Sequence, residues 1–177
     1  MSIKRLIPLF IFVILSFFLY ISLQIDSKKL PSPLINKEFP IVKTKMLYDS
    51  YEPFTKEDFN EKYTLVNVWA SWCATCRAEH ATLLEIFKSK KVNMIGINYK
   101  DTKKDAIKYL EELGNPYHKI TFDFKGEQGL ELGVYATPET FVVNKNGIIK
   151  KKITGQLTKE MWDNEVLPKV KGGGGVK

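Results

Sequence analysis

The chain has 177 residues, a formal net charge of +7 and 44% hydrophobic residues, which suits one globular domain with an extension and excludes a disordered or fibrous protein. Two cysteines are too few for a disulfide-stapled scaffold or for a zinc site of four thiolates. Lysines are spread over the whole length, with short clusters such as Lys150-Lys151-Lys152, and there is no arginine-rich stripe interleaved with aromatic residues. The charge therefore predicts a solvated lysine-rich surface and not a nucleic-acid-binding protein.

The first informative segment is a run without charged residues from Leu6 to Leu23, which follows Lys4 and Arg5. As a helix with a rise of about 1.5 Å per residue it would span about 27 Å, close to the roughly 30 Å of a membrane's hydrocarbon core. No small-residue cleavage site follows, so we expect an uncleaved signal anchor over residues 1–25. The two basic residues would stay in the cytoplasm. The rest of the chain would then face the outer side, which in a bacterium is the periplasm.

The remainder reads as one domain with flexible ends. Residues 26–38 contain two prolines and no periodic pattern, which predicts a linker. Residues 171–177 are rich in glycine and predict a flexible tail. The domain between them is expected to cover residues 39–170.

Within this domain, strands and helices are expected to alternate. The first half predicts a strand at 41–47, a short helix after Thr55, a strand at 63–70, a helix at 73–89, a strand at 92–98 and a helix at 102–113. The second half predicts a strand at 120–124, a helical turn at 127–132, strands at 139–144 and 148–154 around an Asn-Gly turn, and a helix from Thr158 to about Leu167, ended by Pro168. This order is typical of an α/β fold with a central mixed sheet flanked by helices.

The residues that carry chemistry are Cys73 and Cys76, in the segment Trp72-Cys73-Ala74-Thr75-Cys76, where a buried strand meets a helix. The first turn of a helix has unpaired N–H groups and the positive end of the helix dipole, which favour a thiolate. Cys76 returns to nearly the same helical face, close enough to form a disulfide. The segment therefore predicts an exposed attacking sulfur on Cys73, a more buried resolving sulfur on Cys76, and thiol–disulfide exchange through a mixed disulfide.

Three other interpretations of the cysteine pair are less favoured. Haem attachment requires C-x-x-C-H, but Arg77 follows the second cysteine. A zinc site would need both cysteines together with His80 and His118, and His118 is expected in a remote loop. A purely structural disulfide would close a very short loop and would constrain the unfolded chain little. Redox chemistry is therefore predicted, with no metal and no cofactor other than the Cys73–Cys76 disulfide.

A second feature is the pair Thr137-Pro138, which directly precedes the strand expected at 139–144. Proline does not occur inside a central strand, and a Thr–Pro bond at the entry of a strand is a candidate for a cis peptide. If the bond is cis, the backbone of Thr137 is expected to face the cysteine pair and to offer a hydrogen-bonding edge to an extended substrate segment.

Four blocks in order resemble the thioredoxin-like cytochrome c biogenesis thiol:disulfide interchange proteins, the DsbE/CcmG family. They are VNVWASWCATCRAEH at 66–80, GINYKD at 96–101, GNPYH at 114–118 and GVYATPETF at 133–141. The resemblance covers residues 39–170 and implies the three-layer thioredoxin fold, with Pro138 as the cis-proline packed against the disulfide. The family usually has Pro where Ala74 stands and often Gly-Ala where Ala136-Thr137 stand. These departures bear on the redox potential of the cysteine pair and not on the reaction that it performs.

The resemblance also implies a function and partners. Members of this family are inner-membrane proteins whose catalytic domain faces the periplasm. They receive electrons from a membrane thiol reductase and keep the haem-binding cysteines of apocytochrome c reduced, directly or through a partner of the haem-ligation system. Two rival functions are a periplasmic reductant with broad substrates and a membrane-tethered metal carrier. A peroxidase is less favoured, because a peroxidatic cysteine normally lacks this C-x-x-C partner.

Polar and aromatic residues around the motif complete the expected site. Ordinary thioredoxins carry a buried Asp at the position of Asn67, whose amide cannot act as a general base. Glu79 and Glu139 are the candidates to transfer a proton to Cys76 in its place, if burial raises the pKa of either carboxyl. Their alternative interpretation is ordinary surface charge. Trp69 is expected in the core, and Trp72 on the surface that contacts a partner.

Overall fold

The structure is a computed structural model that describes residues 7–24, 32–50, 52–59 and 61–172, with side chains described up to Ile21 in the first of these ranges. The chain divides into two units, residues 1–31 and residues 32–177. In the first unit, helix α1 covers Ile7–Gln24. Within the described part of the chain, no helix is both long enough and apolar enough to cross a membrane. Residues 1–6 and 25 of the expected anchor, and residues 173–177 of the expected tail, lie outside the described residues.

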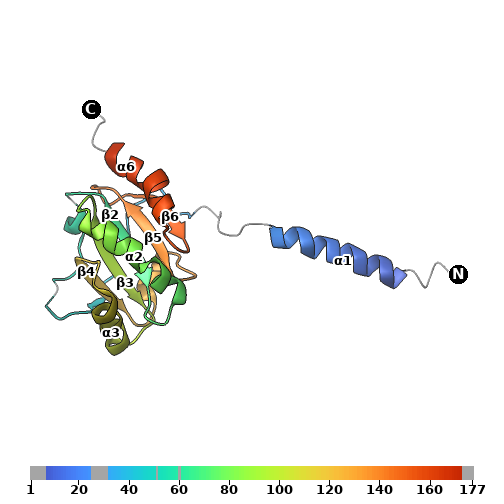
Figure 1. Ribbon diagram of the computed structural model, residues 1–177, viewed down its shortest axis with the longest axis horizontal. Helices are drawn as coiled ribbons and strands as arrows, with labels where there is room; N and C mark the ends of the chain where they lie inside the picture. Colours follow the sequence, from blue (N-terminus) through green and yellow to red (C-terminus); the bar gives the residue numbers. More distant parts are fainter. Residues whose placement is uncertain (1–6, 25–31, 51, 60, 173–177) are drawn as a thin grey trace. The chain divides into compact units, whose positions relative to one another are not determined.

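The second unit is built on a six-stranded mixed sheet in the order β1-β4-β3-β2-β5-β6 (Figure 1). The strands are β1 (Lys45–Met46), β2 (Thr64–Trp69), β3 (Asn93–Tyr99), β4 (Lys119–Asp123), β5 (Glu139–Val143) and β6 (Ile149–Thr154). β2, β3 and β4 are parallel to one another, whereas β1, β5 and β6 pair antiparallel with their neighbours. Every residue of β2 and β5 is buried. The mixed sheet expected from the sequence is therefore present, and β2, which leads to the cysteines, lies inside it.

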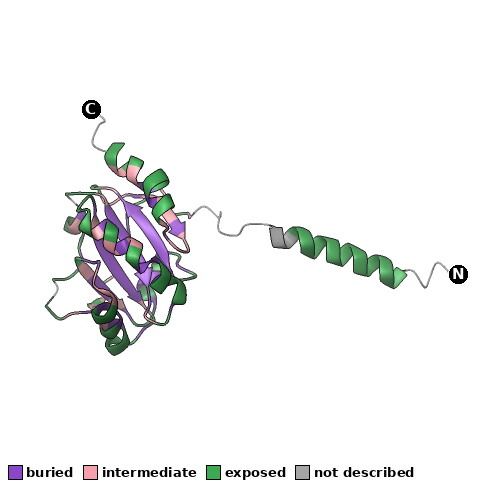
Figure 2. Ribbon diagram, in the orientation of Figure 1, coloured by how far each residue is buried: buried purple, intermediate pink, exposed green. Residues whose placement is uncertain are grey.

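Helices cover both faces of the sheet, and the buried residues lie mainly on its strands (Figure 2). Their side chains form two clusters, one on each face of the sheet. The larger cluster joins the sheet to α2 (Ala74–Lys88), α3 (Lys103–Leu113) and the C-terminal helical segment through residues such as Leu83, Leu110 and Trp162. The smaller cluster packs the opposite face against the 3-10 helix η3 (Lys56–Phe59), the segment after α4 (Glu127–Glu131) and the segment before β1. In it, the ring of Phe39 contacts the rings of Phe59 and Phe141. The sheet is thus the middle of three layers.

Side-chain caps fix where the helices begin. The hydroxyl of Thr102 accepts from the Asp105 N–H at the start of α3, and that of Thr158 accepts from the Met161 N–H at the start of α5 (Lys159–Met161). Gly114 ends α3 with a φ of 88°, a backbone conformation that favours glycine. Each of these boundaries lies within a residue of the expected one.

Two expectations about individual elements are wrong. The strand expected at 41–47 is reduced to the two residues of β1, at the edge of the sheet. The last helix does not end at Pro168: α5 continues into the π-helix η4 (Trp162–Val166) and then into α6 (Leu167–Gly172), which contains the proline. A wider π-helical turn directly upstream accommodates the ring of a proline that an uninterrupted α-helix would exclude.

The residues just before the expected domain also pack on it. The Asn36 N–H donates to the carbonyl of Ile149 (2.8 Å), and the Ile149 N–H donates to the carbonyl of Lys37 (2.9 Å). Part of the segment interpreted as linker is therefore hydrogen-bonded to the β5–β6 hairpin.

Candidate active site

The cysteine pair lies where β2 gives way to α2. Cys73 is the N-cap of α2 and forms a disulfide with Cys76 in the first turn, with their Cα atoms 5.3 Å apart. The Cys76 N–H donates to the sulfur of Cys73 at 3.0 Å, so one of the unpaired donors at the helix start points at this sulfur. Cys73 keeps 6% of its surface exposed and Cys76 keeps 1%. Cys73, which was expected to be exposed, is buried in this oxidised state, and only the order of the two exposures is as expected.

A second loop faces the disulfide. The Thr137–Pro138 peptide bond is cis, as the sequence indicated, and the carbonyl oxygen of Thr137 lies 3.5 Å from the sulfur of Cys73. The carbonyl of Pro138 accepts from the Gly155 N–H at 2.9 Å, which ties this loop to the end of β6. The structure therefore brings Thr137 and Pro138 to the cysteines, although they are more than 60 residues away in the sequence.

Asp101 organises the loop that precedes Cys73. Its buried carboxylate accepts from the N–H (2.6 Å) and hydroxyl (2.8 Å) of Ser71, from the Asn98 amide (2.9 Å) and from the Thr102 N–H (2.8 Å). Trp72 follows in the same loop, 60% exposed, with its indole N–H donated to the carbonyl of Lys100 at 3.0 Å. Trp72 is therefore a fixed aromatic surface beside the disulfide, as expected, and Trp69 is buried in the core.

Glu79 is fully buried within a polar network that the fold assembles from several elements. One carboxyl oxygen accepts from the Asn67 amide at 2.9 Å, and the other accepts from the Leu157 N–H at 2.8 Å. The Asn67 amide also donates to the hydroxyl of Thr140 (3.0 Å), and its oxygen accepts from the hydroxyl of Tyr117 (2.7 Å). The alternative interpretation of Glu79 as surface charge is therefore wrong.

Burial dominates the electrostatics of Glu79. Removal from water raises the pKa of this carboxyl to about 7, and the hydrogen bonds from Leu157 and Asn67 oppose that rise. A carboxyl with a pKa near neutral pH exchanges protons readily under physiological conditions. Because Glu79 follows Cys76 by three residues on α2, both side chains lie on the same side of that helix.

Glu139 is also buried, but it is paired with a cation. The Lys152 ammonium lies 2.9 Å from a carboxyl oxygen of Glu139 and donates to the carbonyl of Gly133 at 2.8 Å. The same ammonium lies 5.3 Å from the ring centroids of Tyr135 and Phe141. Burial raises the pKa of Glu139, and Lys152 opposes this. Of the two carboxyls, Glu79 is the one without a cationic partner among the described interactions, and so it is better suited to carry a proton.

Both histidines have structural surroundings. A ring nitrogen of His80 lies 2.8 Å from the carbonyl of Gly114, and a ring nitrogen of His118 accepts from the Met94 N–H at 3.2 Å. Over the residues that the structure describes, no group of three or more His, Cys, Asp or Glu side chains could hold a metal ion.

Three contributors to the site were missed in the sequence. Tyr117 and Asp101 belong to the GNPYH and GINYKD blocks, but nothing local indicates that their side chains reach Asn67 and Ser71. Lys152 was counted with the solvated lysines, and this is wrong, since its side chain is only 9% exposed. Alternation along β6 gave no signal for this, because it places Lys151 and not Lys152 on the side of Ile149 and Ile153. A register shift opposite Val142 and Val143 puts these two isoleucines in different cores.

The fold has three layers with the sheet in the middle, a disulfide at a helix start and a cis-proline loop that faces it. Together these features define a thioredoxin-like thiol–disulfide oxidoreductase. The sequence profile of the redoxin family matches residues 35–169. The thiol:disulfide interchange protein DsbE of Allochromatium vinosum is 42% identical over 93% of this chain and 91% of its own length. Its namesake in Escherichia coli K12 is 43% identical over 81% of this chain and 77% of its own length. The chain belongs to the DsbE family of thiol:disulfide interchange proteins.

Solved structures agree on the fold. A DsbE protein from Chlorobium tepidum superposes with a TM-score of 0.60 at 21% identity, over 82% of this chain and 98% of its own. The C-terminal domain of a thiol-disulfide oxidoreductase from Bacteroides thetaiotaomicron gives a TM-score of 0.65 at 23% identity, over 78% and 97%. The thioredoxin-like fold expected from the resemblance is confirmed.

Proposed function

We propose that this protein is a membrane-anchored, periplasm-facing reductant that serves cytochrome c maturation. Its substrates would be the oxidised haem-binding cysteines of apocytochrome c, or a haem-ligation partner that carries them. The observation that carries the redox part is the contact between the Cys73 sulfur and the Thr137 carbonyl. This contact places the Cys73 sulfur beside the backbone of Thr137, an arrangement that fits an extended peptide that carries a disulfide. The four sequence blocks support the maturation role.

In the reduced protein, the Cys73 thiolate attacks one sulfur of the substrate disulfide. The substrate S–S bond breaks, a mixed disulfide with Cys73 forms, and the released substrate thiolate takes up a proton. The Cys76 thiol then gives its proton to the Glu79 carboxylate and attacks the sulfur of Cys73. The mixed disulfide breaks, the Cys73–Cys76 disulfide forms and the second substrate thiolate leaves. Two electrons pass from the cysteine pair to the substrate, and a membrane thiol reductase returns the protein to its dithiol state by the reverse exchange.

Each residue of the expected site has a role in this proposal. Asp101 and the start of α2 hold Cys73 in place. The exposed ring of Trp72 is the contact surface for a partner. Thr137 provides the backbone edge. Pro138 holds it in place through the cis bond and its carbonyl's hydrogen bond from Gly155, and Glu139 supports the loop through its ion pair with Lys152.

The maturation role is tested in cells that depend on this chain. Cells carrying Cys73→Ala should lose covalently bound haem in their c-type cytochromes, and a small thiol reductant added to the medium should restore it. Cytochromes that keep their haem in the variant would overturn the role. A loss of haem that the added thiol does not repair would overturn the reductive chemistry.

We further propose that residues 1–25 anchor the mature protein, with the catalytic domain over residues 39–170. The support is the eighteen-residue run without charge from Leu6 to Leu23 and the absence of a small-residue cleavage site after it. Intact mass of the protein extracted from native membranes tests this. Retention of Met1 or Ser2 is the expected result, and a mature N-terminus just after Leu23 would overturn the anchor.

A further inference from the structure

Tyr117 reaches the active-site network from the far side of a neighbouring strand. It lies just before β4, whereas Asn67 lies on β2, and β3 runs between these two strands. The residue of β3 that stands beside Asn67 in register is Gly96. A Cβ atom at Gly96 would lie 3.1 Å from the ring of Tyr117 and 2.9 Å from the indole nitrogen of Trp69. The absence of a side chain at Gly96 therefore leaves the space through which the phenol ring crosses β3.

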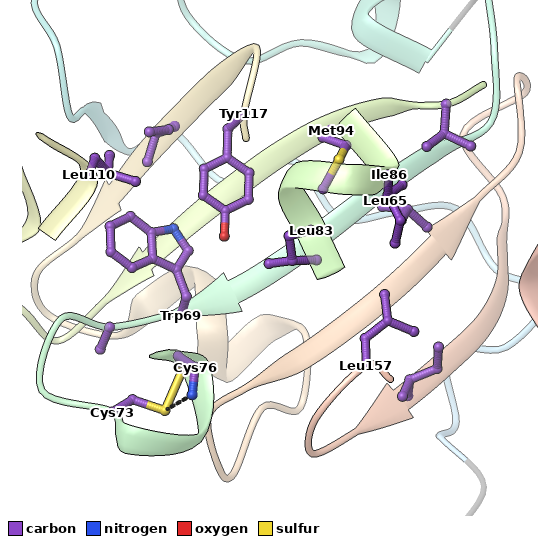
Figure 3. Packing of buried hydrophobic residues seen from close by; sticks show 14 of the residues in the cluster. Leu65, Trp69, Cys73, Cys76, Leu83, Ile86, Met94, Leu110, Tyr117 and Leu157 are labelled. Carbon is purple, nitrogen blue, oxygen red and sulfur yellow. Dashed lines mark hydrogen bonds between the residues drawn. A yellow bond between two sulfur atoms is a disulfide. The ribbon is translucent and has the colours of Figure 1, made fainter. Parts of the chain in front are cut away.

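The ring is also held in place. It stacks on the indole of Trp69 with ring centroids 5.8 Å apart and an interplanar angle of 14°, and both side chains are buried (Figure 3). Tyr109 packs against the same indole, with its ring centroid 5.1 Å away. The hydroxyl of Tyr117 lies 2.7 Å from the amide oxygen of Asn67. The position of this hydroxyl is thus determined by the aromatic stack.

This hydroxyl determines which way the Asn67 amide points. An amide has one oxygen that accepts and one NH₂ group that donates, and a phenol donates to the oxygen. With its oxygen bound to Tyr117, the amide directs its N–H groups to the Glu79 carboxyl and to the hydroxyl of Thr140. Without the phenol, the amide is free to turn, and its oxygen can then accept a hydrogen bond from the O–H of a neutral Glu79.

We infer that Tyr117 is a positioning residue for Glu79, because its hydroxyl fixes the Asn67 amide so that an N–H group faces the carboxyl. Both oxygens of Glu79 then face N–H donors, one from Asn67 and one from Leu157. Such donors stabilise the ionised carboxylate and offer nothing to the proton of a neutral carboxyl. Tyr117 therefore opposes the effect of burial and keeps Glu79 able to release its proton.

Other ionisable groups around Glu79 do not take over this role. Tyr109 and Tyr117 face it from α3 and from the start of β4, and burial raises the pKa of both phenols, so both are neutral near pH 7. The Arg77 guanidinium lies over the Tyr109 ring, 5.1 Å from its centroid. Cys76, on the same helix as Glu79, is held in the disulfide. The hydrogen bonds from Asn67 and Leu157 are therefore the direct contacts that favour the carboxylate.

The test is the proton affinity of Glu79 in the oxidised full-length protein. It is read by pH titration of ¹³C-labelled glutamate carboxyl signals, with the Glu79 signal assigned by its loss in Glu79→Gln. Tyr117→Phe removes one hydroxyl and keeps the ring, and we expect it to raise the proton affinity about tenfold, the size of one hydrogen bond to a charged group. Tyr109→Phe is the matched control, because it removes a hydroxyl from the other ring on Trp69 and should leave the proton affinity nearly unchanged. An unchanged or lower affinity in Tyr117→Phe, with the control behaving as stated, would overturn the inference.

A double-mutant cycle shows whether Tyr117 acts through Asn67. Asn67→Ala alone should raise the proton affinity of Glu79, and Tyr117→Phe should add nothing in that background. If Tyr117→Phe raises the proton affinity of Glu79 as much in the Asn67→Ala protein as it should in the wild type, the positioning role is contradicted. This comparison needs only Asn67→Ala and the double variant, so it holds even where Tyr117→Phe alone unfolds too readily to be titrated. The functional importance of the effect of Tyr117 on Glu79 rests on the proposed proton transfer from Cys76 to Glu79. The titration does not depend on that transfer, which fails separately if Glu79→Gln leaves the pH profile of thiol exchange unchanged.

Discussion

Replacing Glu79 by Gln should remove a pH dependence from the stability of the protein. In the folded chain the pKa of Glu79 is raised from 4.5 to about 7, mainly by burial. Each pKa unit corresponds to about 1.4 kcal/mol, so ionising this carboxyl costs the folded state about 3 kcal/mol relative to the unfolded chain. The sign follows from proton binding: between about pH 4.5 and 7 the folded protein holds a proton that the unfolded chain releases. The stability contributed by this group is therefore full below about pH 4.5, falls as pH rises, and is lost above about pH 7.

The assay is urea unfolding of the oxidised protein at a series of pH values between 5 and 8. In the wild type, the free energy of unfolding should fall across this range. In Glu79→Gln this fall should be smaller, by up to about 3 kcal/mol. Glu139 contributes a slope of the same sign, because its pKa is also raised. Glu160→Gln, which removes an exposed carboxyl from α5, is the control and should leave the slope unchanged. Equal slopes in the wild type and Glu79→Gln would refute the assignment of a perturbed carboxyl to this position.

Two further predictions concern the loops that hold the disulfide. Lys152→Met leaves the buried Glu139 carboxylate without its cation, so we expect the free energy of unfolding to fall by about 3 kcal/mol, and by more as pH rises. The control Lys150→Met should lower it little. Equal losses for the two variants in chemical denaturation would contradict the role of the ion pair. Asp101→Ala removes the acceptor for the backbone N–H groups of Ser71 and Thr102. We therefore expect the free energy of unfolding to fall by about 3 kcal/mol and thiol–disulfide exchange at Cys73 to slow. Unchanged stability together with an unchanged rate of reaction with a model disulfide would contradict this role of Asp101.

The fold could be predicted because its signals are local. Apolar runs, the Asn-Gly turn and capping residues such as Thr102 and Thr158 placed most helices and strands within two residues of where they lie. The first strand and the last helix were exceptions. The strand expected at 41–47 is only Lys45–Met46, and the last helix continues past Pro168, which argues locally for an end, through the π-helical turn at Trp162–Val166.

The candidate site divides in the same way. The cysteines, Trp72 and the Thr137–Pro138 pair carry their chemistry in adjacent residues, so the sequence located them. The environment of the carboxyls could not be read from the sequence, because it depends on strand order. Tyr117 reaches Asn67 only because β4 and β2 lie on either side of β3 and Gly96 leaves a gap between them. Lys152 becomes a buried cation only because β6 pairs with β5 at Glu139.

The central claim is that Cys73 attacks and Cys76 resolves, and trapping of mixed disulfides in native membranes tests it most directly. The structure places Cys73 at the N-cap of α2 beside the Thr137 carbonyl and Cys76 in the interior of the first turn. Cys76→Ser should accumulate covalent complexes with partner proteins that disappear on reduction, because the intermediate on Cys73 can no longer be resolved. Cys73→Ser should accumulate none. Complexes that form with Cys73→Ser and not with Cys76→Ser would contradict the account.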